Sequence, residues 1–234
     1  GSAVGMDKDI AKRLLKEASI PVGPWITISR HEWREAPEKI LRRAVKKLSL
    51  PVFVKPLCTG SSVGIKKVKV KKDLAQAIDF AFQYDTRIMI ETGIDCREIE
   101  CAVLGNEKPE ASITGEILPL HEFYSYEAKY LDPDGAKMNI PAKIPTRLSA
   151  EIRKSAVMGF KALNCNSMAR VDFFLEKKTN RFYLNEINTL PGFTSISMYP
   201  KLWAATGLEY HRLLDRLVEL ALQRHREKSF IKTD

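Results

Sequence analysis

Residues 168–174, MARVDFF, contain the feature that decides how this sequence folds and what it can bind. Polar and apolar residues alternate along the stretch, as in a β-strand with one buried face, and this places Arg170 and Asp172 on the same side. Two charges in an otherwise apolar strand are costly to bury unless they find partners. The pair therefore forms either a cross-strand salt bridge at the surface or part of a binding site.

The predicted partner strand is FYLNEI at residues 182–187, followed by Asn188. Glu186 and Asn188 share one face of it. If the two strands pair as a hairpin, these side chains converge with Asp172, beside Arg170. Hard oxygen donors of this kind suit Mg²⁺, which binds through one or two carboxylates together with phosphates and water.

A shared metal requires one particular register, with Asp172 opposite Glu186. That register fixes the other pairs, namely Arg170 with Asn188, Phe174 with Leu184 and Glu176 with Phe182. It leaves a three-residue loop at 178–180, whose last residue, Asn180, suits the left-handed conformation. A slip by one residue would put Asn185 in the place of Glu186 and remove the second carboxylate.

The rest of the chain shows the periodicities of an α+β protein with two subdomains. Helical patterns occur at 6–19, 32–48, 73–83, 150–163 and 208–226. Strand patterns occur at 25–28, 52–55, 65–70, 87–91, 98–104 and 110–117. The pattern changes after Gly93, which predicts one subdomain at 1–93 and another at 94–234. The segment at about 119–141 is polar and aperiodic, and we expect it to be a mobile lid.

A loop at residues 59–64, TGSSVG, lies between two predicted strands. Its glycines allow a tight turn, so that consecutive N–H groups and the hydroxyls of Ser61 and Ser62 can point at one anion. Lys55, at the end of the preceding strand, adds a charge that could bind the same phosphates. The loop matches neither the Walker A motif nor the Gly-x-Gly-x-x-Gly of a dinucleotide fold. By itself it is more typical of a plain hairpin loop.

Residues 189–198, TLPGFTSISM, directly follow the predicted metal strand. Glycine and hydroxyl residues there could donate hydrogen bonds to a substrate carboxylate or to a developing oxyanion. A simple strand-to-helix connection explains the same residues equally well.

The composition is that of an ordinary folded protein, with 44% hydrophobic and 29% charged residues among 234. The net charge of +9 fits an anionic partner such as nucleic acid, a membrane surface or the phosphates of a small ligand. The lysines are dispersed and no stacking array of aromatic residues occurs, which argues against nucleic acid. No apolar run suits a membrane-spanning helix or a signal peptide. The four cysteines form no Cys-x-x-Cys pair, so we expect reduced thiols, no zinc site and a cytoplasmic location.

Taken together, these motifs resemble those of the ATP-grasp ligases. The resemblance rests on Lys55, the loop at 60–64, ARVD at 169–172 and NEINTLPG at 185–192. Three further motifs, MDKD at 6–9, YEAKY at 126–130 and SISMYP at 195–200, narrow it to the D-alanine–D-alanine ligase family. The motifs follow the family's order from Ser2 to about Leu222.

The resemblance implies an ATP-grasp fold, in which the nucleotide lies between the sheets of two α/β subdomains. It implies that the carboxylate of one D-alanine attacks the γ-phosphate of ATP, and that the amine of a second D-alanine attacks the acyl phosphate. The products would be ADP, phosphate and D-alanyl-D-alanine for peptidoglycan. Two Mg²⁺ ions, or Mn²⁺ in their place, would neutralise the developing charge.

The resemblance also implies roles for individual residues. For ATP, the expected contacts are Lys8, Lys55, Ser61, Ser62 and Lys129 with the phosphates, Glu91 to Ile94 with adenine, and Glu98 with ribose. The expected metal ligands are Asp172, Glu186 and Asn188. For the chemical steps, Arg170 is expected to contact the transferring phosphoryl group and Gly192 the oxyanion. Ser197 and Met198 are expected to contact the carboxylate of the second D-alanine. Ser61 and Tyr130 would belong to a hydrogen-bonded set that holds the lid closed.

The chain also departs from the family pattern. It opens at Met6-Asp7-Lys8, where a separate N-terminal α/β domain would end, so we expect that domain and its contact with the first D-alanine to be missing. We expect slow or no dipeptide synthesis by the chain alone, and a homodimer for the full-length protein. Thr59 and Thr92 stand where some relatives carry charged residues.

Other functions remain open on these residues. One is another ATP-grasp carboxylate–amine ligase, including the D-alanine–D-lactate type, although Tyr130 favours the dipeptide ligase. Another is a nucleotide-binding remnant without activity. A remnant should have lost a metal-type residue, whereas Asp172, Glu186 and Asn188 are all present.

Overall fold

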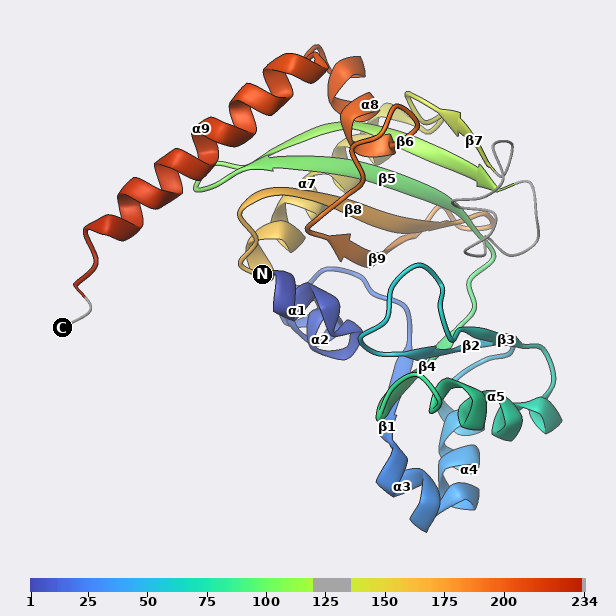
Figure 1. Ribbon diagram of the computed structural model, residues 1–234. Coiled ribbons are helices and arrows are strands. Elements are labelled where there is room, and N and C mark those ends of the chain that lie inside the picture. Colours follow the sequence, from blue (N-terminus) through green and yellow to red (C-terminus); the bar gives the residue numbers. More distant parts are fainter. Residues whose placement is uncertain (120–135, 233–234) are drawn as a thin grey trace.

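Two antiparallel β-sheets form the framework of the computed structural model, which describes residues 1–119 and 136–232 (Figure 1). The smaller sheet has the strand order β1-β4-β2-β3. Its strands are β1 Trp25–Ser29, β2 Val52–Pro56, β3 Lys66–Val68 and β4 Arg87–Thr92. The larger sheet has the order β7-β6-β5-β8-β9. Its strands are β5 Cys96–Gly105, β6 Glu110–Pro119, β7 Ala136–Asn139, β8 Ser167–Glu176 and β9 Phe182–Asn188.

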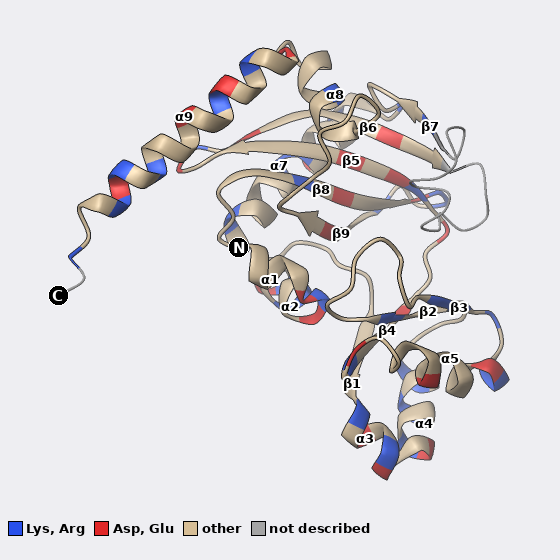
Figure 2. Cartoon of the chain, viewed as in Figure 1, with Lys and Arg blue, Asp and Glu red and all other residues tan. Residues whose placement is uncertain are grey.

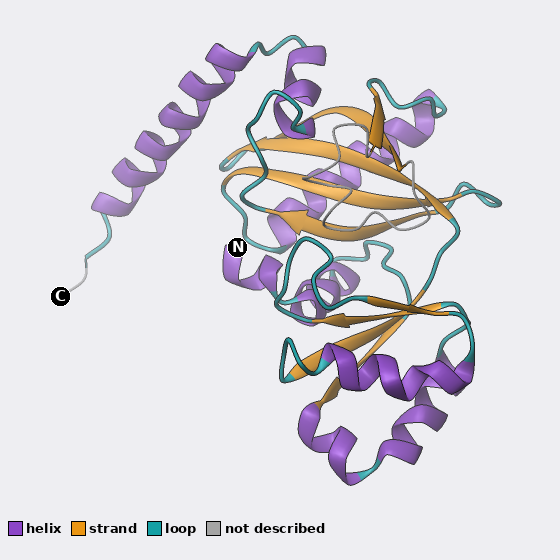
Figure 3. Ribbon diagram, turned by 45° about the vertical axis from the view of Figure 1, so that its right-hand side comes forward, coloured by secondary structure: helices purple, strands orange, loops and turns teal. Residues whose placement is uncertain are grey.

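Helices pack against both sheets, and the predicted α+β class is confirmed (Figure 3). In the first half of the chain they are α1 Ser2–Met6, α2 Lys8–Glu17, α3 Arg30–Glu35, α4 Pro37–Lys47 and α5 Leu74–Ala81, with a 3₁₀ turn, η1, at Lys71–Asp73. In the second half they are α7 Thr146–Ala162, α8 Met198–Ala205 and α9 Tyr210–Ser229. Figure 1 shows α9 extending away from the larger sheet. Across the described residues, we find no helix with the length and apolar character needed to span a membrane.

One face of the smaller sheet is apolar and packs against α4 and α5. Alternate residues of the strands supply it, such as Ile26 and Ile28 of β1 and Ile88 and Ile90 of β4. The residues between them therefore point to the opposite face of the sheet, towards α2 and the larger sheet.

The larger sheet has an apolar core on each face. Helices α7 and α2 cover the first, where Phe160 and Leu15 pack against Val171 and Phe173 of β8. Helices α8 and α9 cover one end of the second face, with a core formed by Ala102, Leu104, Ile117, Met198, Tyr199, Leu202, Trp203, Leu213 and Leu220. The rest of this second face carries several charged side chains, among them Glu100, Arg170 and Asp172.

Helix α2 contacts both sheets with different chemistry. Its apolar residues Ala11 and Leu15 belong to the core of the larger sheet. Its polar side meets the smaller sheet, where Asp9 accepts hydrogen bonds from Trp25 Nε1 and Thr27 Oγ1, both at 2.8 Å. The subdomains at 1–93 and 94–234 stay a prediction, because α2 precedes residue 93 but shares the core of the larger sheet.

Some elements differ from the predicted pattern. The helix expected at 32–48 is two helices, because Pro37 begins a new helix as its first residue. Helix α8 begins at Met198, the last residue of the segment at 189–198, and continues to Ala205, where the sequence predicted no helix. Strand β7 lies within the aperiodic segment at 119–141 and pairs with β6. Residues 120–135 of that segment are outside the described residues, so the lid stays a prediction.

Candidate functional site

Strands β8 and β9 pair with the predicted register at the polar positions. Asp172 lies opposite Glu186, and Arg170 lies opposite Asn188. These residues alternate along β8 with buried ones such as Val171, so they lie on the face of the sheet that also carries α8. The predicted convergence of two carboxylates, an amide and an arginine on one face is confirmed.

The turn between these strands differs from the prediction. The N–H of Glu176 donates to the carbonyl of Arg181 at 2.8 Å, so the loop has four residues, 177–180, instead of three. Asn180 has a φ of 55°, the left-handed conformation predicted for it. Phe174 pairs with Tyr183 and Leu175 with Phe182, so the predicted pairs of Phe174 with Leu184 and of Glu176 with Phe182 are wrong.

A β-bulge at Asn185 reconciles this turn with the register of the site. Uninterrupted pairing from the turn would put Asn185 opposite Asp172, but the register shifts by one residue here and brings Glu186 opposite instead. The bulge also lets Leu184 and Ile187 both point into the core, which strict alternation would forbid. The extra residue thus corrects the one-residue slip that would have removed the second carboxylate.

Three carboxylates lie in a row across β5, β8 and β9, because Glu100 pairs with Asp172 and Asp172 with Glu186 (Figure 2). Like charges at directly opposed positions destabilise a sheet unless a cation compensates them. Sequence reasoning missed Glu100. Its only signal was the alternation with Glu98, and no local pattern reveals that β5 lies beside β8.

Arg170 provides a compensating charge. Its Nε and one terminal nitrogen donate to the two carboxylate oxygens of Asp172, both at 2.8 Å, and Nε lies 3.2 Å from Glu100 Oε2. Burial would lower the pKa of the guanidinium, but the charges of Asp172 and Glu100 outweigh burial and raise this pKa well above its ordinary value. Arg170 is therefore a fixed cation whose planar fork is oriented by two carboxylates.

The donor set at this face fits a magnesium ion that also binds phosphates. Asp172, Glu186 and Asn188 offer carboxylate and amide oxygens, the donors that Mg²⁺ prefers, and the ion keeps water at its remaining positions. Within 1–119 and 136–232, no group of three or more His, Cys, Asp or Glu residues could hold a metal alone. A metal here would therefore need ligands from a substrate or water, and its binding by these three residues stays a prediction.

The polar face of the smaller sheet carries two predicted nucleotide residues, Lys55 on β2 and Glu91 on β4. Lys55 Nζ lies 2.7 Å from Glu91 Oε2, and the Glu91 side chain is 3% exposed. Its other oxygen, Oε1, lies 2.5 Å from the Nζ of Lys12, a residue that sequence reasoning did not single out. Burial would raise the pKa of Glu91, but the two ammonium groups outweigh burial and hold this pKa at about 2.

Lys8 connects the two polar faces electrostatically. Its Nζ donates to the carbonyls of Leu57 at 3.1 Å and Thr59 at 2.5 Å, at the base of the loop at 59–64. Burial lowers the pKa of Lys8, and the charge of Glu186 on the larger sheet opposes this decrease whereas Lys55 adds to it. A predicted metal ligand and two predicted phosphate lysines therefore lie within electrostatic reach of one another.

The loop at 59–64 turns tightly, as its sequence predicts. Ser61, Ser62 and Gly64 have φ values of 51°, 61° and 76°, and the N–H of Val63 donates to the carbonyl of Gly60 at 3.0 Å. A Cβ on Gly64 would lie 2.7 Å from Pro56 Cγ, so only glycine fits there. Phosphate binding by the two serines stays a prediction.

The segment that follows β9 leads into α8. The Ser197 hydroxyl accepts a hydrogen bond from the Thr194 N–H at 3.0 Å, and a Cβ on Gly192 would lie 2.8 Å from Ser197 Oγ. Met198 begins α8 and is buried in the core of the second face of the larger sheet. The segment is therefore a strand-to-helix connection, and its contacts with a substrate stay a prediction.

The remaining predicted site residues are at the junction of the sheets or outside the described residues. Ile94 lies in the linker between β4 and β5, and Glu98 lies on the same face of β5 as Glu100. Lys129 and Tyr130 lie outside the described residues, so their contacts with ATP and with Ser61 stay predictions.

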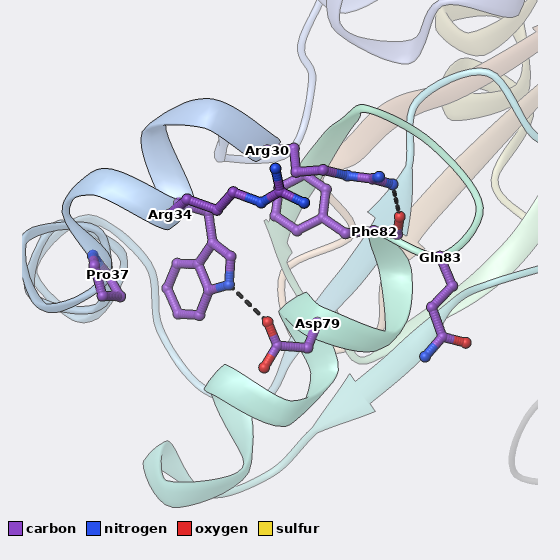
Figure 4. Close-up of a pocket in the computed structure, with 7 residues that line it drawn as sticks. Arg30, Arg34, Pro37, Asp79, Phe82 and Gln83 are labelled. Carbon is purple, nitrogen blue, oxygen red and sulfur yellow. Dashed lines mark hydrogen bonds between the residues drawn. The ribbon is translucent and has the colours of Figure 1, made fainter.

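A cavity of about 630 Å³ lies elsewhere, between α3 and α5 (Figure 4). Its lining residues are Arg30, Trp33, Arg34, Pro37, Asp79, Phe82 and Gln83. Arg30 donates to the carbonyl of Phe82, and Trp33 Nε1 donates to Asp79 Oδ1 at 2.7 Å. None of the predicted site residues lines this cavity.

Comparison with known proteins identifies relatives of this chain. A family model described as "D-ala D-ala ligase C-terminus" matches residues 14–219. The chain is 54% identical to the D-alanine–D-alanine ligase A of Bradyrhizobium diazoefficiens over 233 residues, which are 99% of this chain and 62% of that protein. It is 50% identical to the D-alanine–D-alanine ligase A of Escherichia coli K12 over 232 residues, which are 99% of this chain and 63% of that protein.

Solved structures show the same fold. The D-alanine–D-alanine ligase from Coxiella burnetii superposes with a TM-score of 0.84 at 41% identity, over 97% of this chain and 59% of that one. The VanG D-Ala:D-Ser ligase from Enterococcus faecalis superposes with a TM-score of 0.83 at 37% identity, over 93% of this chain and 62% of that one. The chain thus spans 59–63% of the length of these four proteins. The predicted ATP-grasp fold is confirmed, and the chain belongs to the family of the D-alanine–D-alanine ligase C-terminal region.

Proposed function

We propose that this chain is the ATP- and metal-binding part of an ADP-forming ligase that joins two D-alanine molecules into D-alanyl-D-alanine for peptidoglycan synthesis. The observation that supports this most directly is the pairing of Asp172 with Glu186 and of Arg170 with Asn188 on one polar face. The relatives that are 54% and 50% identical are D-alanine–D-alanine ligases, whereas the D-Ala:D-Ser ligase is 37% identical. D-alanine is therefore the second substrate that we propose.

In this proposal the nucleotide lies between the polar faces of the two sheets. Lys8 and Lys55 bind its phosphates from the side of the smaller sheet, together with the serines of the loop at 59–64. The end of β4 and the linker that follows it, from Glu91 to Ile94, contact adenine, with Glu91 contributing only its backbone because its side chain is paired with Lys12 and Lys55. Glu98 binds ribose. Asp172, Glu186 and Asn188 would hold Mg²⁺, which would supply positive charge to neutralise the phosphates.

Arg170 stabilises the negative charge on the phosphoryl group as it is transferred. A carboxylate oxygen of the first D-alanine attacks the γ-phosphorus, and the bond to the β–γ bridging oxygen breaks, so that ADP leaves. Asp172 and Glu100 hold the guanidinium on the polar face of the larger sheet, where its positive charge can stabilise the transferring group.

The segment after β9 serves the second step. The amine of the second D-alanine attacks the acyl carbon, phosphate leaves, and the nitrogen gives up a proton to water. The Gly192 N–H stabilises the oxyanion, and Ser197 with the backbone of Met198 holds the carboxylate of the second D-alanine at the start of α8. We place this reaction in the cytoplasm and propose a homodimer for the whole protein.

Calorimetric titration with ATP, with and without Mg²⁺, tests the proposal. We expect Asp172→Asn to weaken Mg²⁺-ATP binding at least about tenfold, the usual scale for a change at a metal site. Binding of ATP in excess chelator should change little. Glu110→Gln, an exposed carboxyl at the start of β6 in the same sheet, is the matched control and should bind as the wild type does.

Equal Mg²⁺-ATP affinities for wild type and Asp172→Asn would contradict the metal assignment. No ATP binding by the wild-type chain would contradict the proposed function itself.

A further inference from the structure

A single buried carboxylate holds two ammonium groups on the polar face of the smaller sheet. Glu91 Oε1 lies 2.5 Å from Lys12 Nζ, and Oε2 lies 2.7 Å from Lys55 Nζ. The side chains of Lys12 and Glu91 are each 3% exposed, whereas that of Lys55 is 12% exposed. Lys12 therefore lies at the closed end of this triad and Lys55 at its more accessible end.

Three separate elements bring the triad together. Lys12 comes from the polar side of α2, Glu91 from β4 and Lys55 from β2. The Lys12 ammonium also lies 3.4 Å from the carbonyl of Gly23 and 5.5 Å from the centre of the Trp25 ring. A lysine in this place has no access to a ligand and no other anionic partner among the described contacts, so its charge serves Glu91.

The charges of the triad do not cancel. Two lysines and one glutamate sum to +1, and the excess resides at the end occupied by Lys55. Without Lys12, the pair of Glu91 and Lys55 would be neutral, and the Lys55 ammonium would be compensated by the buried carboxylate. In a poorly hydrated environment, where the effective dielectric constant is low, that difference of one charge changes the attraction for a nearby anion strongly.

We infer that Lys12 is a positioning residue, which neutralises Glu91 from behind and so leaves the charge of Lys55 available to the phosphates of the nucleotide. This inference rests on the proposed function, because it takes Lys55 as a phosphate ligand. It gives Lys12 a role in ATP binding without any contact to ATP.

The inference distinguishes a charge effect from a merely structural one. If Lys12 acts through the charge of Lys55, its loss weakens binding of a ligand that carries phosphates and spares one that lacks them. If Lys12 only supports the fold, its loss weakens both ligands alike. The ratio of the affinities for ATP and adenosine is therefore the informative quantity.

The experiment measures both affinities by competition against a fluorescent ATP analogue, with the full chain and Mg²⁺ present. Lys12→Met should weaken ATP binding about tenfold, the scale of one charge-assisted hydrogen bond, and change adenosine binding less than about twofold. Lys16→Met is the matched control, because Lys16 lies one turn further along α2 and is exposed. It should leave both affinities unchanged.

A double variant keeps the test decisive if Lys12→Met folds poorly. Lys12→Met with Glu91→Gln removes both buried charges of the pair and leaves Lys55 uncompensated, so the ATP-to-adenosine ratio should return to within about threefold of the wild-type ratio. An unchanged ratio in Lys12→Met, or a ratio that stays low in the double variant, would overturn the inference. Wild-type protein that binds no ATP would instead overturn the proposed function, so the two failures are distinguishable.

Discussion

Replacing Glu91 by glutamine should destabilise the fold. The Glu91 carboxylate pairs with the ammonium groups of both Lys12 and Lys55, and glutamine carries no charge to compensate them. Lys12 is almost fully buried and cannot turn to water when Glu91 is neutral. Burial lowers the pKa of Lys12 and the charge of Glu91 opposes that decrease. Removing the carboxylate therefore leaves a buried cation whose desolvation is no longer compensated.

The size of the effect follows from the pKa of Glu91. A carboxyl whose pKa falls from 4.5 in the unfolded chain to about 2 in the folded one contributes about 3 kcal/mol, at about 1.4 kcal/mol per tenfold change. Because the folded pKa is the lower one, this stability is fully present above pH 4.5 and is lost as the pH falls towards 2. Removing one partner of a buried pair costs about 3–5 kcal/mol in other proteins, which agrees.

Urea unfolding followed by tryptophan fluorescence measures this difference. With a dependence on urea of about 3 kcal/mol/M, Glu91→Gln should lower the midpoint by about 1 M at pH 7. The difference from wild type should shrink as the pH falls from 4.5 towards 2. Asp95→Asn is the control, because Asp95 pairs with Lys177 at the surface, and it should leave the midpoint unchanged. Equal midpoints for Glu91→Gln and wild type at pH 7 would refute the reasoning.

Two further substitutions, each with a control variant, test a buried hydrogen bond and the backbone conformation of the loop at 59–64. Tyr199 is fully buried and donates to the carbonyl of Val103 at 2.9 Å, so Tyr199→Phe should lower the free energy of unfolding by about 1–2 kcal/mol in thermal melts. Tyr210→Phe removes a longer, solvent-exposed hydrogen bond of 3.3 Å to the carbonyl of Phe193 and should be nearly neutral, and equal losses would contradict the assignment. Gly64→Ala places a Cβ at positive φ and should cost the loop at least about 1–2 kcal/mol, seen as faster amide exchange at 59–65. Gly60→Ala meets no atom within 4 Å and should exchange as the wild type does; the same rates in both variants would show that the loop tolerates the strain.

Much of the hairpin at the site was predictable because its information is local. Alternation along 168–176 places Arg170 and Asp172 on one face, and a short turn limits which residues can lie opposite them. The pairs nearest the turn were mispredicted because two compensating irregularities, a longer loop and a bulge at Asn185, leave the register of the polar residues unchanged. Neither irregularity has a signal in alternation alone.

Elements without a long periodic pattern were the ones missed. Helix α8 has only eight residues and follows a glycine-containing segment, so it resembles a connection in the sequence. The break before α4 depends on Pro37, whose ring fits the first turn of a helix but not its interior. Strand β7 is four residues long and owes its form to pairing with β6.

By itself, the sequence determined the α+β class, the faces of the strands and the turn-forming loop at 59–64, because each depends on neighbours along the chain. Only the tertiary structure decided the bulge that puts Glu186 opposite Asp172. Only the tertiary structure decided that β5 lies beside β8, which adds Glu100 to the row of carboxylates. Only the tertiary structure brought Lys12 to Glu91, 79 residues away. Such contacts arise when helices and sheets pack, and a pair of residues far apart in the chain leaves no periodic trace in a single sequence.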